Sequence, residues 1–263
     1  MNFKKVIACL GIVTSISMGI FANENNSSLE GMQELFVFPV DSVLDLNVDI
    51  DNILEKDLSL TTDIDMPQIL VVHTYPDEQY ECGSSVVEAG KELVKYLENN
   101  YEVSVFHYTD NENEVSKMGA YDRIEEQVNV LLTEYPSIEV IIDIQRDVNP
   151  YYNEEIKNTT TTVGISFVNG LNIHHTPEID SYSANVENNL ALSAQMKYFD
   201  NLKDNQVIEE IYVYPYKYNS ELNANLLITN FGYNTDTLEQ VINTIPTFSD
   251  TLANVLDLSP AYR

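Results

Sequence analysis

The chain has 263 residues, of which 42 are acidic and 13 are basic, and its formal net charge at pH 7 is −29. This charge opposes binding to nucleic acid or to anionic lipid, so we expect neutral or cationic partners. Without its N-terminal segment, the length corresponds to about one folded domain.

Residues 1–22 have the pattern of an export signal. Lys4 and Lys5 precede an uncharged, largely apolar run at 6–22, and a polar stretch, NENNSS, follows it. The run is at the short limit of a membrane span, so it is either a signal peptide or an uncleaved membrane anchor. Both alternatives place the folded part outside the cytoplasm, in the cell envelope or secreted. If the segment is removed, Cys82 is the only cysteine and no intrachain disulfide can form.

The rest of the chain divides at Pro67. Residues 23–66 are acidic and lack a sustained period, and we interpret them as a stalk or loosely attached extension. Beyond them, apolar runs alternate with helical patterns. Strands are expected at 68–74, 101–108, 137–147, 162–169, 209–214 and 225–231. Helices are expected at 84–100, 121–136, 182–204 and 236–255, the last with a capping box of Asp236 and Glu239.

This alternation of strands and helices predicts a three-layer α/β domain at 67–263, with a largely parallel central sheet of about six strands. In such sheets, ligands bind beyond the carboxyl ends of the strands. The rule selects His73, the stretch from Gln145 to Asp147, and the segment around Asn230.

Several motifs at these positions occur in a recognisable order. They are VVHTYPDEQY (71–80), the helix and strand at 121–147, YNSEL (218–222) and LLITNFGYNTDTLEQV (226–241). Together they resemble the stage II sporulation protein P family of peptidoglycan hydrolases, over about residues 67–256. The resemblance implies a zinc-dependent amidase fold that removes stem peptides from glycan strands during engulfment of the forespore. In that chemistry, two histidines and a carboxylate hold a metal that activates water, and a further glutamate moves protons.

The metal positions of the resemblance are only partly kept. His73 and Glu78 match the first histidine and the glutamate of one signature, whereas its second histidine is Tyr75. The next box reads Asp143-Ile144-Gln145-Arg146-Asp147, with Gln145 where a histidine is expected. The implied metal set is therefore His73, Glu78 and Gln145, and it is incomplete.

The catalytic and substrate positions implied by the resemblance follow the same box and the later motifs. Asn230 stands where the catalytic glutamate is expected, and Arg146 is the other catalytic candidate. Arg146 either fixes its loop or holds a substrate carboxylate. Substrate contacts are expected from Asp147, Tyr218 and Asn219.

Amides at positions 145 and 230 favour a catalytically impaired protein. An amide oxygen is a weak ligand for zinc, and losing an acid/base group commonly lowers a rate by about 10²- to 10⁴-fold. We expect zinc to be absent or weakly bound, and the protein to bind peptidoglycan or to regulate cell-wall hydrolases or other sporulation proteins by contact.

Two other interpretations stay open. The protein is an active zinc-dependent N-acetylmuramoyl-L-alanine amidase that tolerates Gln145 or uses His174 or His175, or it is a secreted interaction scaffold. Adjacent histidines in an extended segment point to opposite faces, so at most one of that pair would face a given site. His107, at the end of its expected strand, is interpreted as a hydrogen-bonded structural residue.

Overall fold

The computed structural model describes residues 35–38, 48–61, 65–110, 116–148, 160–172, 174–175, 180–181, 185–203 and 206–261. The expected signal or anchor at 1–22 lies outside these residues. Within the described part of the chain, no helix has the length and apolar character needed to cross a membrane.

The centre of the fold is a six-stranded sheet in the order β2-β1-β3-β8-β4-β7. Its strands are β1 (Ile69–Val72), β2 (Val105–His107), β3 (Val140–Asp147), β4 (Ile165–Gly170), β7 (Ile208–Tyr214) and β8 (Leu226–Tyr233). All neighbouring pairs are parallel except β4 and β8, so β4 and β7 run against the other four strands. The expected largely parallel sheet of about six strands is confirmed.

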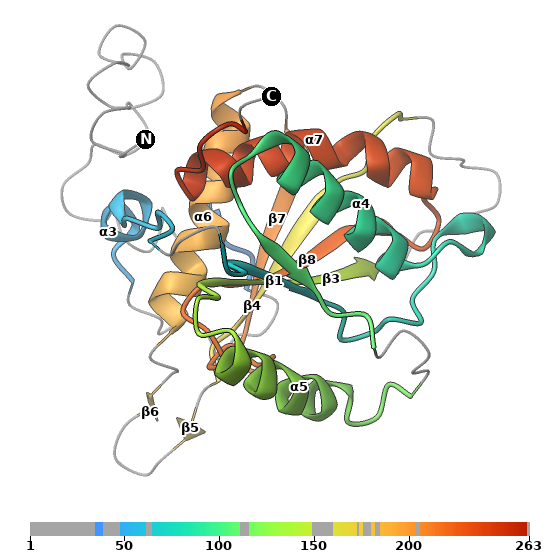
Figure 1. The fold of residues 1–263 in the computed structure, drawn as a ribbon. Helices are drawn as coiled ribbons and strands as arrows, with labels where there is room; N and C mark the ends of the chain where they lie inside the picture. The colour runs from blue at the N-terminus through green and yellow to red at the C-terminus, as the bar shows by residue number, and fades with distance from the viewer. Residues whose placement is uncertain are drawn as a thin grey trace, which may run out of the picture.

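Helices cover the two faces of this sheet unequally (Figure 1). One face carries α4 (Val86–Asn100), α6 (Val186–Leu202) and α7 (Leu238–Val255), and the other carries α5 (Ala120–Glu134). We call these the three-helix face and the α5 face. The smaller elements are α3 (Ile50–Glu55), the 3-10 turn η2 (Glu81–Gly83), and an antiparallel pair of β5 (His174–His175) with β6 (Asp180–Ser181). The three-layer architecture is confirmed.

Strand alternation assigns each side chain of the sheet to one of two cores. In β1, Ile69 and Val71 pack in the core under the three-helix face, whereas Leu70 and Val72 pack in the core under α5. The burial of all four side chains explains why the strand reads as an unbroken apolar run.

Two expected boundaries differ in detail. The capping box of α7 is formed by Thr237 and Gln240, one residue after the expected pair, and the carboxylate of Asp236 instead accepts a hydrogen bond from the backbone N–H of Tyr233. The expected strand at 101–108 shortens to β2, because Tyr101 pairs with Pro260 rather than with the sheet.

The described parts of the acidic extension pack against the domain. Phe36 and Ile53 are 2% and 0% exposed and belong to the core under the three-helix face. Val37 lies along the edge of β7, where its N–H donates to the Ile211 carbonyl at 2.8 Å and its carbonyl accepts from the Val213 N–H at 2.9 Å. Residues 35–38 and 48–61 are therefore not loosely attached, and packing begins well before residue 67.

Candidate functional site

His73 lies on the three-helix face, at the end of β1. Its Nδ1 is 3.0 Å from the Ile144 carbonyl oxygen, and its Nε2 is 2.8 Å from Nε2 of His107. Because a carbonyl only accepts, Nδ1–H of His73 is the donor to Ile144, and Nε2 of a neutral His73 accepts from His107. Both ring nitrogens of His73 are thus engaged.

The surroundings of this histidine pair keep both rings neutral. A Cβ added to Gly90 of α4 would lie 2.7 Å from Nε2 of His73, so the helix approaches the rings as closely as a glycine allows. Burial, followed by the charge of the neighbouring histidine, lowers the pKa of His73 to about 3. Burial likewise lowers the pKa of His107 to about 4. The pair is a structural hydrogen bond between β1 and β2.

Asp143 lies on the opposite, α5 face of the sheet and holds its neighbours there by hydrogen bonds. Its carboxylate accepts from the backbone N–H of Thr74 at 2.9 Å, from the Thr74 hydroxyl at 2.6 Å and from Nε2 of Gln145 at 2.7 Å. Burial raises the pKa of Asp143 to about 6, although these three donors act in the other direction. The carboxylate fixes which way the Gln145 amide points, since its NH2 group is held by Asp143.

Glu78 approaches the end of β3 from the loop after β1. One carboxylate oxygen is 3.3 Å from Nζ of Lys117, and the other accepts from the backbone N–H of Arg146 at 3.2 Å. The guanidinium of Arg146 donates to the carbonyls of Gln79, at 3.0 Å, and Asp147, at 3.3 Å. Arg146 therefore bonds the loop after β1 to the end of β3, which agrees with the loop-fixing alternative.

Asn230 lies beside Gln145 in the sheet. The two residues are register partners in β8 and β3, and Asn230 is also the partner of Ser166 in β4. Its Nδ2 is 3.3 Å from the Ser166 hydroxyl, and the residue is 9% exposed. The two amides thus occupy neighbouring strands on the α5 face.

Tyr75 completes this cluster. Its ring packs edge-to-face on Tyr121 of α5 at 5.8 Å, and Nζ of Lys117 lies 5.1 Å from the ring centre. Burial raises the pKa of Tyr75, and the charges of Asp143 and Glu78 raise it further. Tyr75 therefore lies with Glu78, Asp143 and the amides, whereas His73 does not.

The expected substrate residues lie around the same face. Asn219 donates from Nδ2 to the Tyr121 carbonyl at 2.9 Å, and the Tyr218 ring packs on Tyr121 at 5.4 Å. Asp147 accepts from the backbone N–H of Val148, and its charge contributes to raising the pKa of nearby tyrosines on β7. These three residues therefore contact or face the α5 side of the molecule.

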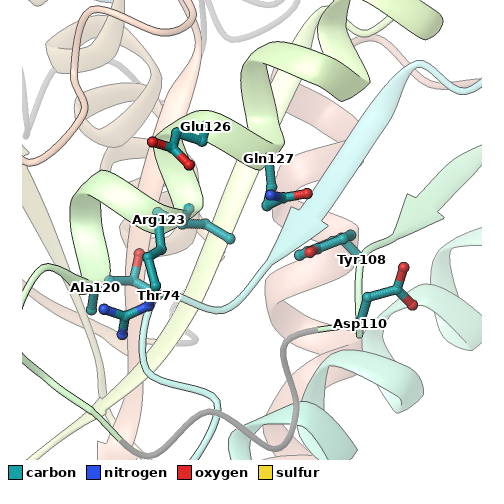
Figure 2. Close-up of a pocket in the computed structure, with 8 residues that line it drawn as sticks. Thr74, Tyr108, Asp110, Ala120, Arg123, Glu126 and Gln127 are labelled. Atoms are coloured by element: carbon teal, nitrogen blue, oxygen red, sulfur yellow. The ribbon is translucent and has the colours of Figure 1, made fainter.

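A polar pocket of about 180 Å³ lies next to the cluster, between the ends of β1 and β2 and the first turns of α5. Figure 2 shows Arg123 on the side of Thr74 and Ala120, with Tyr108 and Asp110 across from it. Glu126 and Gln127 complete the polar lining. Arg123 also holds the preceding loop through the carbonyls of Met118 and Ser116. With one guanidinium and two carboxylates, the pocket suits a small polar group.

Comparison with known proteins identifies the family. The sequence matches Stage II sporulation protein P (SpoIIP) over residues 20–253. The chain belongs to the SpoIIP family. Membership supports a peptidoglycan hydrolase-like function in sporulation and an extracytoplasmic, cell wall-associated location.

Solved structures give more distant likenesses. The N-acetylmuramoyl-L-alanine amidase AmiC2 of Nostoc punctiforme is 15% identical, with a TM-score of 0.40, over 73% of this chain and 96% of that one. The catalytic domain of CwlV, an N-acetylmuramoyl-L-alanine amidase from Bacillus (Paenibacillus) polymyxa var. colistinus, is 9% identical, with a TM-score of 0.42, over 73% of this chain and 99% of that one. A search of curated proteins gave no match.

The residues of this SpoIIP-family chain do not fit zinc at the expected positions. The structure brings Glu78 and Gln145 to one region but leaves His73 on the other face, because alternation along β1 turns Thr74, not His73, toward Asp143. Across the described ranges, no group of three or more His, Cys, Asp or Glu side chains could hold a metal ion. The side chains of His174 and His175 lie outside what the structure describes.

Sequence reasoning missed two participants in the region, Thr74 and Tyr121, and it interpreted a third, His107, as a hydrogen-bonded structural residue without naming its partner. Thr74 and Tyr121 contact Asp143 and Gln145, and His107 pairs with His73. The signal for Thr74 was present, since it shares the parity of Leu70 and Val72 in β1. Tyr121 and His107 come from separate elements, and their local sequence does not indicate which residue each one contacts. The hydrogen-bonded, structural role expected of His107 is confirmed.

Proposed function

We propose that this SpoIIP-family protein binds peptidoglycan without cleaving it. The observation that supports the proposal is the chemistry of the α5 face, where the positions implied for two histidines and a catalytic glutamate carry a phenol and two amides. Phenol and amide groups can form hydrogen bonds, but Tyr75, Gln145 and Asn230 neither supply a zinc site nor take up and return a proton at neutral pH.

The contacts around these residues favour a stable binding face. Gln145 is held by Asp143, and Glu78 is held by Lys117 and by the Arg146 N–H. Because these side chains are already held in place, the protein loses little side-chain conformational entropy when a ligand contacts them. Amide groups suit the amide-rich stem peptides and acetamido groups of peptidoglycan, since each amide both donates and accepts.

Binding and cleavage are measured separately on the full chain. The protein is incubated with insoluble peptidoglycan, with and without added zinc, and we follow sedimentation with the wall and the release of stem peptides. We expect co-sedimentation, no peptide release above background, and substoichiometric zinc after dialysis. Stem-peptide release that depends on stoichiometric zinc would instead establish an active amidase.

Reversion provides a sharper test of the site geometry. The triple variant Tyr75→His/Gln145→His/Asn230→Glu is expected to bind zinc, because positions 75 and 145 would place two imidazoles near Glu78 on the α5 face. The double variant Gln145→His/Asn230→Glu is the matched control and is expected to bind zinc much more weakly, since His73 faces α4. Equal zinc affinities for the two variants would refute the assignment of Tyr75 to the site.

A regulatory role through contact with cell-wall hydrolases is the outcome to consider if the full chain does not sediment with peptidoglycan. In that case an unchanged rate of wall digestion by an active hydrolase, with the chain present and absent, would remove the regulatory interpretation as well.

A further inference from the structure

Six tyrosines form one connected series across the α5 face. From the candidate site outward, ring centres are separated by 5.8 Å between Tyr75 and Tyr121 and by 5.4 Å between Tyr121 and Tyr218. Tyr218 lies 5.7 Å from Tyr214 and 6.0 Å from Tyr216. Tyr214 in turn lies 6.2 Å from Tyr216 and 6.4 Å from Tyr212. We call these six residues the tyrosine series.

The series follows from strand alternation in β7. Ile211 and Val213 are fully buried in the core under the three-helix face, so Tyr212 and Tyr214 point to the opposite face of the sheet. Tyr216 continues the alternation beyond the strand and is 57% exposed. Tyr212, Tyr214 and Tyr218 are half-buried, which leaves part of each ring accessible.

The turn after β7 holds its rings in a fixed and unusual position. Tyr218 and Asn219 have φ values of 45° and 56°, in the left-handed region. Asparagine adopts this region readily, but a tyrosine there is uncommon and marks backbone strain. The strain is maintained by contacts to α5: Asn219 donates to the Tyr121 carbonyl, and Lys217 pairs with Glu125 at 2.6 Å.

Gly170 at the end of β4 allows the turn to lie this close to the sheet. A Cβ at this position would come within 2.5 Å of the Lys217 carbonyl oxygen and 2.7 Å of the Tyr216 carbonyl oxygen. The rings are therefore placed by several independent contacts, so a ligand would meet a preformed surface.

The chemical groups of the tyrosine series indicate which class of ligand it would bind. Asp147 lies close enough to Tyr212 and Tyr214 to raise the pKa of both hydroxyls in addition to burial, so the hydroxyls stay protonated and can donate as well as accept. The nearby carboxylate and the net charge of −29 disfavour polyanions. Aromatic rings with neutral hydroxyls suit a neutral carbohydrate, which offers apolar C–H faces and hydroxyl groups together.

We propose that the tyrosine series is a glycan-binding surface on which the sugar backbone of peptidoglycan lies, leading to the amide cluster at Tyr75. This assignment rests on the proposed wall-binding function and adds the part of the polymer that is recognised. Neighbouring ring centres in the series lie 5.4 to 6.4 Å apart, so the series offers a sugar chain several aromatic contacts in succession.

The test uses the full chain and three probes: intact peptidoglycan, glycan strands freed of their peptides, and isolated stem peptides. Binding to the soluble probes is followed by tyrosine fluorescence, which is unobscured because the chain contains no tryptophan. The variant Tyr214→Ala/Tyr216→Ala is expected to bind peptide-free glycan about 10-fold or more weakly than the wild type. Tyr214→Phe/Tyr216→Phe keeps both rings and is expected to stay within about 3-fold of the wild type.

Tyr198→Ala is the matched control, because Tyr198 is also half-buried but belongs to α6. It should leave glycan affinity unchanged, and circular dichroism would check that every variant is folded. If the wild type sediments with intact peptidoglycan but the alanine pair binds glycan as well as the wild type does, the glycan surface is refuted while wall binding stands. Wild-type binding to stem peptides but not to peptide-free glycan would also refute the glycan surface and leave wall binding intact. No binding to any of the three probes refutes both proposals.

Discussion

Acidification should destabilise the protein through the buried histidine pair. An unfolded histidine has a pKa near 6.5, whereas His73 and His107 in the folded protein have pKa values of about 3 and about 4. The unfolded chain therefore binds more protons below pH 6.5, and stability falls as pH drops through this range. For His73, the loss between pH 8 and pH 5 is about 2 kcal/mol. The half-buried His107 adds about 1 to 2 kcal/mol after allowance for solvent.

The matched variant for this prediction is His107→Gln, whose side-chain NH2 can still donate to His73. Unfolding by urea is measured for both proteins at pH 8 and pH 5. Between pH 8 and pH 5, the free energy of unfolding of the variant should fall by about 1 to 2 kcal/mol less than that of the wild type.

Other charged groups do not obscure this comparison. Lys91 also faces the pair and is common to both proteins. Asp143 acts in the opposite sense, because its pKa of about 6 lies above the ordinary value and its stabilisation is lost as pH rises. Its contribution cancels between wild type and variant. If the free energy of unfolding falls equally in the two proteins between pH 8 and pH 5, the histidine pair is not the cause of the acid sensitivity.

Three further substitutions test the packing that positions the site. Gly90→Ala should lower the free energy of unfolding by about 1 to 3 kcal/mol, because the added methyl would meet His73, and a stabilised variant would show that helix propensity outweighs this contact. Asp143→Asn should cost about 1 to 3 kcal/mol at pH 8, because the new NH2 group would replace one of the two oxygens and face either the Thr74 N–H or the Thr74 hydroxyl and the Gln145 NH2 group. An unchanged urea midpoint would contradict the described network. Gly170→Ala should displace the turn at 216–218 and weaken glycan binding several-fold with little loss of helix content by circular dichroism, whereas wild-type affinity would show that the turn position is unimportant.

Sequence patterns predict the alternation of strands and helices well, because burial on both faces of a strand and on one side of a helix is a local property. The direction of a strand is not local. Ile165–Gly170 and Ile208–Tyr214 read as ordinary buried strands, yet both run against the other four. The tyrosines of β7 are consequently spread along the α5 face rather than gathered with the carboxyl ends of β1 and β3.

The sequence indicates which strand ends carry the candidate residues, but not which of these residues lie together on one face of the sheet. Motif order points to the ends of β1, β3 and β8, and the structure places Gln145 and Asn230 beside each other there. Motif matching takes no account of which face a side chain occupies, so it grouped His73 with Gln145 across the sheet. Thr74 reaches the α5 face because it continues the alternation of β1. Tyr75 reaches the same face only because the chain bends at Thr74 and Tyr75, which ends the alternation.

The bridge between Val37 and β7 bears on how the protein should be cut for study. A fragment that begins at residue 67 would leave the Ile211 carbonyl and the Val213 N–H unpaired along an outer strand. Exposed strand edges recruit other chains, so such a fragment is prone to edge-to-edge association. It would also uncover the surface that Phe36 and Ile53 fill. A fragment that keeps residues from 35 onward retains the Val37 bridge and should associate less than the shorter fragment at the same concentration.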